Sequence, residues 1–268
     1  MSSISKSRGL EWLFEYTPYR ELFFFLVWRD MKIRYKQTLL GVTWAVIQPF
    51  FTMIVFTLFF GRMAGIDSEG IPYPIFSYSA LLPWTYFSVA VSLSGNSLLA
   101  NSRLISKVYF PRAIIPSASA LSGIVDFAIA YVVLIGMLIY YKIPFSWGML
   151  WWIVFLIPLI VLIVSLGMIL SALNVKYRDI KYAIPFFIQS LLFISPVIYP
   201  TSLVPEQFQK YMALNPLTGL INAFRASLLP DRAVEWKSFL ISLGVISILF
   251  VVAIIYFRKT EKAFADVI

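Results

Sequence analysis

The residues of this sequence best suited to binding or chemistry are cations and aromatic rings gathered in short polar breaks. The stretch NSRLISKVYFPR, residues 101–112, carries three cations, no acid and an aromatic pair followed by a proline. An amphipathic turn or two of helix with an aromatic end can insert into a cleft on another protein. A basic loop that orients the chain and touches anionic lipid explains the charge as well, although not the aromatic tip.

A second basic group lies closer to the N-terminus. In RELFFFLVWRDMKIRYKQ, residues 20–37, seven consecutive apolar residues are followed by the cations Arg29, Lys32, Arg34 and Lys36. Seven residues are too few to cross a bilayer. The pattern predicts a helix lying in the membrane interface or a simple juxtamembrane anchor, and the two interpretations are compatible.

Asp126 is the one acidic residue that falls inside a long apolar run. A charged side chain at the centre of a bilayer costs about 2.5 to 3.5 kcal/mol on insertion scales. We therefore expect the Asp126 carboxyl to be paired, neutral or exposed to a wet cavity. A structural, hydrogen-bonded role and a role in transport both fit this expectation.

Catalysis by this chain alone is not expected. The sequence has no Cys and no His, which removes disulfides, thiolate or imidazole metal sites, and Cys or His nucleophiles. Motifs of the types GxxxxGK[ST], GxGxxG, GxSxG, HExxH and CxxC are absent. A single intramembrane acid also cannot supply the carboxylate pair of a hydrolase. No bound cofactor is expected, and a membrane-embedded transferase or polymerase is disfavoured.

A transporter or channel remains as the class of protein. Ion-coupled carriers usually carry several intramembrane ionisable groups, or broken-helix ion sites with inverted repeats. This sequence shows little of either. If the chain takes no energy from an ion gradient through its own residues, a partner on the cytoplasmic side must deliver it.

The elements that position these residues are apolar helices. The chain has 268 residues, a mean hydropathy of +0.83 and 13% charged residues, against roughly 25% in soluble domains. Long solid apolar runs predict membrane-spanning helices and not the alternating strands of a barrel. The sequence thus predicts an all-α integral membrane protein with six spans, at about 39–60, 78–99, 113–141, 149–173, 184–199 and 237–257.

The distribution of Lys and Arg predicts the orientation of these spans. Alternate connecting segments, beginning with the N-terminal one, hold 16 of these cations, and the other segments hold 6. By the positive-inside rule both termini face the cytoplasm. The net charge of +9 is therefore mainly an orientation signal. Nucleic-acid binding is not expected, because no basic domain exists to carry it.

Four spans carry unusual residues. Aromatic and polar side chains share one helical stripe in the first span and another in the fifth, which indicates aromatic packing or a pore lining. The second run is rich in Ser and has to be shielded by protein or face water. In the fourth span Gly167 and Ser171 have the spacing that lets helices approach closely, which favours an internal helix contact.

The sequence resembles a known protein family in several stretches, which occur in the same order and cover nearly the whole chain. It resembles the permease subunit of type-2 ATP-binding cassette exporters, in the branch that exports polysaccharides or polyol phosphates such as O-antigen, capsule or teichoic acid. The matching stretches are RDMKIRYKQTLLGVTWAVIQPF, LLPWTYFS, NSRLISKVYFPRAIIP, NVKYRDIKYAIPFFIQSLLFISPVIYP, ALNPLTGLINAFRASLL and YFRKTEKAFADVI.

The resemblance implies a homodimeric pore of six-helix subunits in the cell inner membrane, with two copies of a separate ATPase that holds ATP and Mg. It implies an amphipathic interfacial helix within a cytoplasmic segment 1–38, a transmembrane domain 39–257, a second cytoplasmic loop 174–183, an outer gate segment 200–236 with re-entrant helices, and a cytoplasmic tail 258–268. The coupling loop 101–112 is implied to dock into the ATPase through Arg103, Leu104, Ile105, Lys107, Tyr109, Phe110 and Arg112.

The substrate that the resemblance implies is a glycan attached to a polyprenyl pyrophosphate. Arg29, Arg34 and Lys36 are then candidates for recognising its phosphates through charge-assisted hydrogen bonds. Aromatic rings offer a sugar chain contact without deep directional wells, so that a polymer slides. The candidate path residues are Trp44, Gln48, Phe51, Phe59, Phe186, Gln189 and Phe193.

The size of a six-helix bundle favours a dimer independently of the resemblance. A bundle of six helices has little room for a hydrated polymer, whereas two bundles can enclose a path between them. The alternatives are the permease of a drug or lipid exporter with the same architecture and, from another class, an ion-coupled carrier.

Overall fold

A computed structural model describes residues 17–36, 41–177, 179–230 and 232–261. These residues form helices and connecting segments, with no strand among them, so the predicted all-α class is confirmed. The main elements are α2 (Arg20–Lys36), η2 (Gly41–Thr43), α3 (Trp44–Phe56), η3 (Thr57–Met63), α4 (Tyr73–Ala100), α5 (Ser102–Lys107), α6 (Ile114–Leu121), α7 (Ile124–Tyr140), η4 (Trp147–Trp151), α8 (Trp152–Lys176), α9 (Ile180–Ile194), η5 (Thr201–Leu203), α10 (Glu206–Ala213), α11 (Pro216–Ser227) and α12 (Trp236–Glu261).

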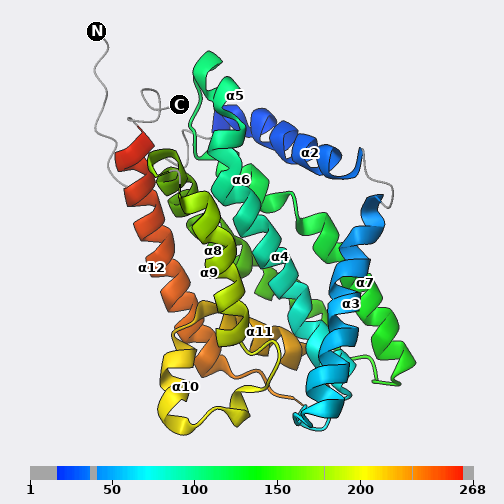
Figure 1. Ribbon diagram of the computed structural model, residues 1–268. Helices are drawn as coiled ribbons and strands as arrows, with labels where there is room; N and C mark the ends of the chain where they lie inside the picture. The colour runs from blue at the N-terminus through cyan, green and yellow to red at the C-terminus, as the bar shows by residue number, and fades with distance from the viewer. Residues whose placement is uncertain (1–16, 37–40, 178, 231, 262–268) are drawn as a thin grey trace.

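The long helices stand side by side in a bundle. Figure 1 shows α2 and α5 at one end of this bundle and α10 and α11 at the opposite end. Within the described residues, four helical stretches are long and apolar enough to cross a membrane: Gly41–Met63, Ile114–Tyr140, Trp147–Lys176 and Trp236–Glu261. They correspond to four of the six predicted spans.

The other two predicted spans fall on α4 and α9. Helix α4 has 28 residues, which is long enough to cross, but its many Ser side chains make it more polar. Helix α9 has 15 residues, fewer than the roughly 20 of a typical spanning helix. The predicted span 184–199 also overshoots, because α9 ends at Ile194.

The polar helix α4 lies in the core of the bundle. It packs most extensively against α8 and also contacts α3, α6, α7 and α11. Most of its residues are buried, and the hydroxyls of Ser77 and Ser97 donate to carbonyls three or four residues earlier in the same helix. Protein therefore shields most of α4, which is one of the two environments that the sequence predicts for this run.

Close approach of α4 and α8 depends on Gly167. A Cβ atom at this position would lie 1.9 Å from Oγ of Ser94, so only a residue without a side chain fits there. The Ser94 hydroxyl donates to the carbonyl of Pro116 on α6 at 2.7 Å. Gly167 of the fourth span thus makes an internal helix contact, as the sequence indicates.

The third predicted span, 113–141, is broken in the structure. Helix α6 ends at Leu121 and α7 begins at Ile124, with Ser122 and Gly123 between them. A Cβ atom on Gly123 would lie 2.9 Å from the ring of Tyr86 on α4. The break brings the first turn of α7, which contains Asp126, toward α2.

Helix α2 lies across one end of the bundle (Figure 1). The predicted helix is present, but it is not amphipathic, because its consecutive apolar residues point to every side. Leu26 is buried and joins a small core cluster with Leu98, Phe110 and Phe257. Phe24 and Trp28 are exposed on the same helix, as a membrane interface would require.

Candidate functional site

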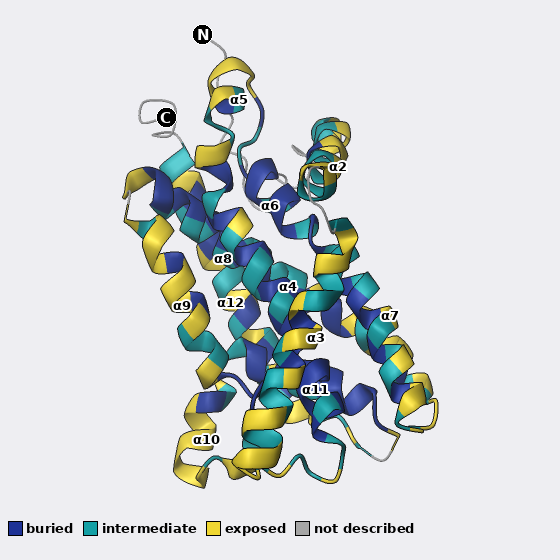
Figure 2. Ribbon diagram, turned by 45° about the vertical axis from the view of Figure 1, so that its right-hand side comes forward, coloured by how far each residue is buried: buried dark blue, intermediate teal, exposed yellow. Residues whose placement is uncertain are grey.

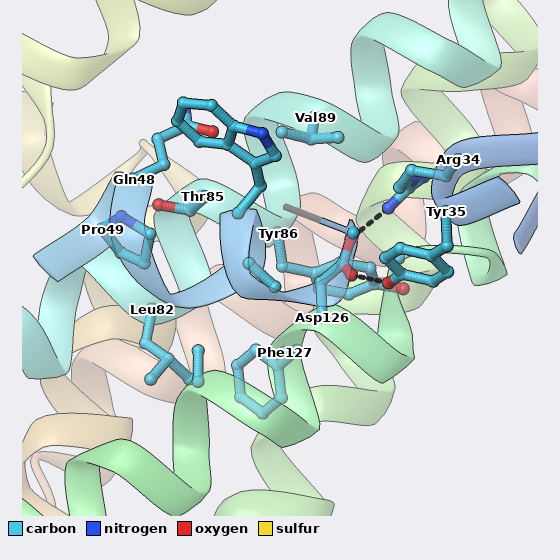
Figure 3. Close-up of a pocket in the computed structure, with 15 residues that line it drawn as sticks. Arg34, Tyr35, Gln48, Pro49, Leu82, Thr85, Tyr86, Val89, Asp126 and Phe127 are labelled. Carbon is cyan, nitrogen blue, oxygen red and sulfur yellow. Dashed lines mark hydrogen bonds and ion pairs between the residues drawn. The ribbon is translucent and has the colours of Figure 1, made fainter. Parts of the chain in front are cut away.

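A cavity of about 240 Å³ lies between α2, α3, α4 and α7. Figure 3 shows side chains from each of these elements around it. Polar groups are contributed by Arg34, Tyr35, Gln48, Thr85 and Asp126, and the rings of Trp44, Tyr86 and Phe127 supply apolar surface. The cavity therefore combines residues that the sequence analysis assigned to three different roles.

The carboxylate of Asp126 anchors one side of this cavity. It accepts hydrogen bonds from Nη1 of Arg34 and from the hydroxyl of Tyr35, both on α2 (Figure 3). Nη2 of Arg34 also donates to Oγ of Ser122 at 3.1 Å. The structure thus pairs the intramembrane acid, one of the three states that its sequence context allows, and ties α2 to the first turn of α7.

The hydroxyl of Tyr35 is partly buried where it meets this carboxylate. Burial and the hydrogen bond to Asp126 both raise the pKa of Tyr35 above its ordinary value. The phenol therefore stays protonated and keeps its role as a donor across the physiological pH range.

The predicted phosphate-binding group does not form one open cluster of cations. Arg29 donates to Oδ1 of Asp30 through Nε at 3.0 Å and Nη2 at 2.7 Å, and Arg34 is held by Asp126. Lys36 is exposed. An incoming phosphate has to compete with carboxylates for both arginines. The sequence could not reveal this, because packing selects Asp126 from a position 92 residues away.

The predicted path residues all lie on exposed surface. The aromatic members, Trp44, Phe51, Phe59, Phe186 and Phe193, are each more than half exposed, and Gln48 and Gln189 are exposed as well. Helices α3 and α9 both pack on α4, and Figure 2 shows them on either side of it. Two aromatic faces therefore flank one side of the subunit.

Helix α4 adds polar side chains that the sequence analysis did not assign to a path. Partly exposed polar residues recur on it every three or four positions, namely Thr85, Ser88, Ser92 and Asn96. Thr85 also lines the cavity beside Gln48. The regular spacing of these residues within an apolar run is the sequence signal that identifies such a stripe.

The predicted coupling loop, residues 101–112, lies at the same end of the bundle as α2 (Figure 1). Its short helix α5 exposes Arg103 and Lys107, and Tyr109 just beyond is 92% exposed. The aromatic pair is split, because Phe110 is buried. The predicted docking surface therefore changes: Tyr109 is available to a partner, whereas Phe110 belongs to the core.

Three other residues of the predicted docking surface also face the protein. Ile105 is buried and Leu104 is packed against the same core cluster as Phe110. The backbone N–H of Arg112 donates to Oε1 of Glu261 at 2.9 Å, and its Nη1 donates to the carbonyl of Glu261 at 2.6 Å. One side of a short surface helix such as α5 has to face the protein, and the sequence pattern alone does not reveal which residues lie on that side. Arg112 instead ties the loop to the end of α12.

The segment boundaries also differ in part from the predicted ones. Helix α8 runs on to Lys176 and α9 begins at Ile180, so most of the predicted loop 174–183 is helical. Helix α12 runs to Glu261, into the predicted tail 258–268, whose last residues lie outside the described part of the chain. Residues 1–16 and 37–38 of the predicted segment 1–38 also lie outside it.

The apolar helices and the bundle they form define a multi-pass membrane protein. Residues 21–229 match the family described as ABC-2 type transporter, and the chain therefore belongs to that family of membrane permeases. Family membership implies a partnership with an ATP-binding subunit, and it implies that the chain is not itself an enzyme.

Similarity to individual relatives extends over almost the whole chain. An O-antigen export system permease protein RfbA from Myxococcus xanthus is 28% identical over 260 residues, which cover 94% of this chain and 97% of the relative. An RfbA from Klebsiella pneumoniae is 27% identical, over 90% of this chain and 92% of the relative. The polysialic acid transport protein KpsM of Escherichia coli is 26% identical, over 78% and 82%.

Proposed function

We propose that this chain is the membrane permease of an ATP-driven exporter that moves a lipid-linked polysaccharide across the inner membrane. The observation that carries the proposal is the nearly end-to-end match to permeases named for O-antigen export. The similarity to a polysialic acid transport protein supports the same substrate class.

In the proposed arrangement, α4 and α9 complete six crossings and both termini face the cytoplasm. Short α9 and polar α4 are acceptable as spans because α4 is shielded by its neighbours and α9 packs on α4 and α8. The predominance of cations at the end that carries α2 and α5 supports placing that end inside.

Two copies of the chain would form the path. The core of one subunit is filled by α4, most of whose side chains are buried, which leaves little room for a polymer. The aromatic faces of α3 and α9 are exposed instead. In a homodimer these faces would meet their counterparts and give a sugar chain flat, apolar contacts along which it slides.

We infer a route by which movement of the ATPase would reach the path. A partner bound at Tyr109 and α5 would pull on α6, which follows α5 in the chain and packs against α2. Oγ of Ser119 on α6 donates to Oδ2 of Asp30 on α2 at 2.8 Å. The Arg34 and Asp126 pair then links α2 to α7 and to the cavity beside Trp44. Movement of the loop would thus reach the inner end of the path.

Reconstitution tests the proposed function. The chain, with the ATP-binding subunit that co-purifies from its native membrane, is placed in proteoliposomes loaded with polyprenyl-pyrophosphate-linked glycan. We expect transfer of glycan across the bilayer that requires ATP and both proteins. Stimulation of ATP turnover by drugs or phospholipids but not by the glycan would favour the rival exporter class. Gradient-driven transport by the chain alone would refute the proposal in favour of a carrier.

A further inference from the structure

A polar cavity is lined by residues of α11 and neighbouring segments, and Figure 1 shows α11 at the end of the bundle opposite α2 and α5. It has a volume of about 210 Å³ and lies between the loop before α4, η5, α11 and the segment before α12. A neighbouring cavity of about 690 Å³ shares several of its residues and adds the side chains of Trp236 and Thr218. The polar lining of the smaller cavity is Glu69, Thr201, Asn222, Arg225, Arg232 and Glu235.

Arg225 is the buried member of this lining, with 3% of its surface exposed. Its Nη2 donates to the carbonyls of Phe76 at 3.2 Å and Pro196 at 2.9 Å. The guanidinium lies 3.7 Å from the centre of the Phe76 ring. Its Nε has no hydrogen-bond partner among the described residues. A buried donor without an acceptor is unfavourable, so a ligand that brings an acceptor gains free energy here.

Glu69 and Arg232 fix the opposite wall. Nη2 of Arg232 lies 2.5 Å from Oε2 of Glu69 and donates to its backbone carbonyl at 3.1 Å. Oε1 of Glu69 accepts from the hydroxyl of Ser202 at 2.6 Å. These bonds join three segments that are distant in the sequence, which preforms the cavity.

The charges and hydrogen-bonding groups select the kind of ligand. Two arginines face two glutamates in the smaller cavity, so neither an anion nor a cation gains a net attraction there. A hydroxyl group both donates and accepts, and therefore matches a lining of guanidinium, amide, hydroxyl and carboxylate.

The larger cavity offers the complement to such hydroxyls. Trp236 is 52% exposed beside it, and a flat ring of this kind can cover the apolar face of a sugar. Oγ1 of Thr218 is buried in its lining without a hydrogen-bond partner among the described residues. A second unsatisfied polar group thus accompanies the ring.

The larger cavity adds Lys210 and Lys237 beside the same two glutamates, so the charge balance that favours a neutral ligand belongs to the smaller cavity. We propose that the smaller cavity, with the ring of Trp236 beside it, is a binding site for one neutral sugar unit. Hydroxyls of the sugar would accept from Nε of Arg225 and bond to Asn222 and Glu235, and its ring would lie near Trp236. In the proposed orientation this end of the bundle is the outer face, so the site would bind the first sugar units of a glycan as it leaves the path. That placement rests on the proposed function, whereas the binding itself does not.

Saturation-transfer NMR on the purified full chain in nanodiscs tests the site. The probes are mannose, galactose, N-acetylglucosamine and rhamnose, with inorganic phosphate as an anionic competitor. We expect saturable transfer to at least one of the neutral sugars. Loss of one hydrogen bond in Asn222→Ala or in Glu235→Ala weakens that binding about fivefold. Ser247→Ala, which removes an exposed hydroxyl on α12, is the matched control and leaves binding unchanged.

Three results would overturn the assignment: no saturable transfer from any of the four sugars, equal binding by the variants and the control, or displacement of the sugar by phosphate. The thermal unfolding midpoints of the variants verify that they are folded. Export is measured separately, with the ATP-binding subunit present. Normal export without sugar binding would refute this site but not the proposed function. Sugar binding without export would refute the proposed function but not this site.

Discussion

Replacing Asp126 by Asn is expected to loosen α2 from the bundle. The carboxylate accepts two bonds from α2, one from the cation of Arg34 and one from the hydroxyl of Tyr35. The side chains of Arg34 and Asp126 are 22% and 23% exposed. The free-energy cost of breaking this pair therefore lies between two limits. Breaking an exposed ion pair costs about 0.2 to 1 kcal/mol, and removing one partner of a buried pair costs about 3 to 5 kcal/mol.

An intermediate loss of about 2 kcal/mol follows from these limits. Every 1.4 kcal/mol changes an equilibrium constant about tenfold. The opening of α2 should therefore become roughly thirtyfold more frequent in Asp126→Asn. Hydrogen exchange, followed by mass spectrometry on peptides from residues 20–36 in nanodiscs, measures this change directly.

Two variants serve as controls for this prediction. Glu206→Gln removes an exposed carboxylate at the other end of the bundle and should leave exchange in α2 unchanged. Combining Arg34→Gln with Asp126→Asn should cost less than the sum of the single changes, because neither charge is then left alone. Unchanged exchange in Asp126→Asn, or fully additive effects in the double variant, would refute the role of this pair.

Three further predictions concern other parts of the chain. Tyr109→Ala should reduce co-purification of the ATP-binding subunit without loss of folded protein. Phe110→Ala should instead destabilise the chain itself by about 3 to 5 kcal/mol, because the Phe110 ring is buried. Equal behaviour of the two variants in pull-down and in thermal unfolding would contradict this difference. Gly167→Ala should cost about 1 to 3 kcal/mol by overpacking α8 against Ser94, and Ser94→Gly should recover part of the loss in the same unfolding assay; no recovery would argue against the contact. Burial alone would raise the pKa of Glu69, but the bonds and charge of Ser202 and Arg232 outweigh it and lower the pKa below 4.5. The contact of Glu69 with Arg232 and Ser202 is therefore fully stabilising above pH 4.5 and is lost as pH falls through the lowered pKa. Thermal unfolding midpoints measured between pH 5 and 3 should then decline less in Glu69→Gln than in the unaltered chain. Parallel declines of the two midpoints would contradict the pairing.

The elements that the sequence predicts well are those dictated by the bilayer. A helix is the form that satisfies its own backbone in lipid, so runs such as 149–173 and 237–257 predict helices almost regardless of their neighbours. The polar character of α4 likewise predicts burial, because lipid cannot solvate its serines.

The sequence does not predict which distant residues pair with one another or which side of a short segment is buried. The partner of Asp126 lies 92 residues away and is chosen by the break at Gly123 and the placement of α2. Tyr109 and Phe110 are neighbours of similar character, yet one is exposed and the other is in the core. The orphan Nε of Arg225 appears only once α11 is packed against α4, since the sequence shows this residue merely as a polar interruption.

In the proposed exporter, the exposed aromatic faces of α3 and α9 line the path of the glycan. Photo-crosslinking during turnover tests it most directly, with a benzophenone amino acid in place of Phe51 or Phe186 and, as control, in place of Ile248, which is exposed on α12. We predict ATP-dependent adducts with glycan at positions 51 and 186 and adducts with phospholipid alone at position 248. Glycan adducts of equal yield at position 248, or none at the two aromatic positions, would show that these faces do not line the path.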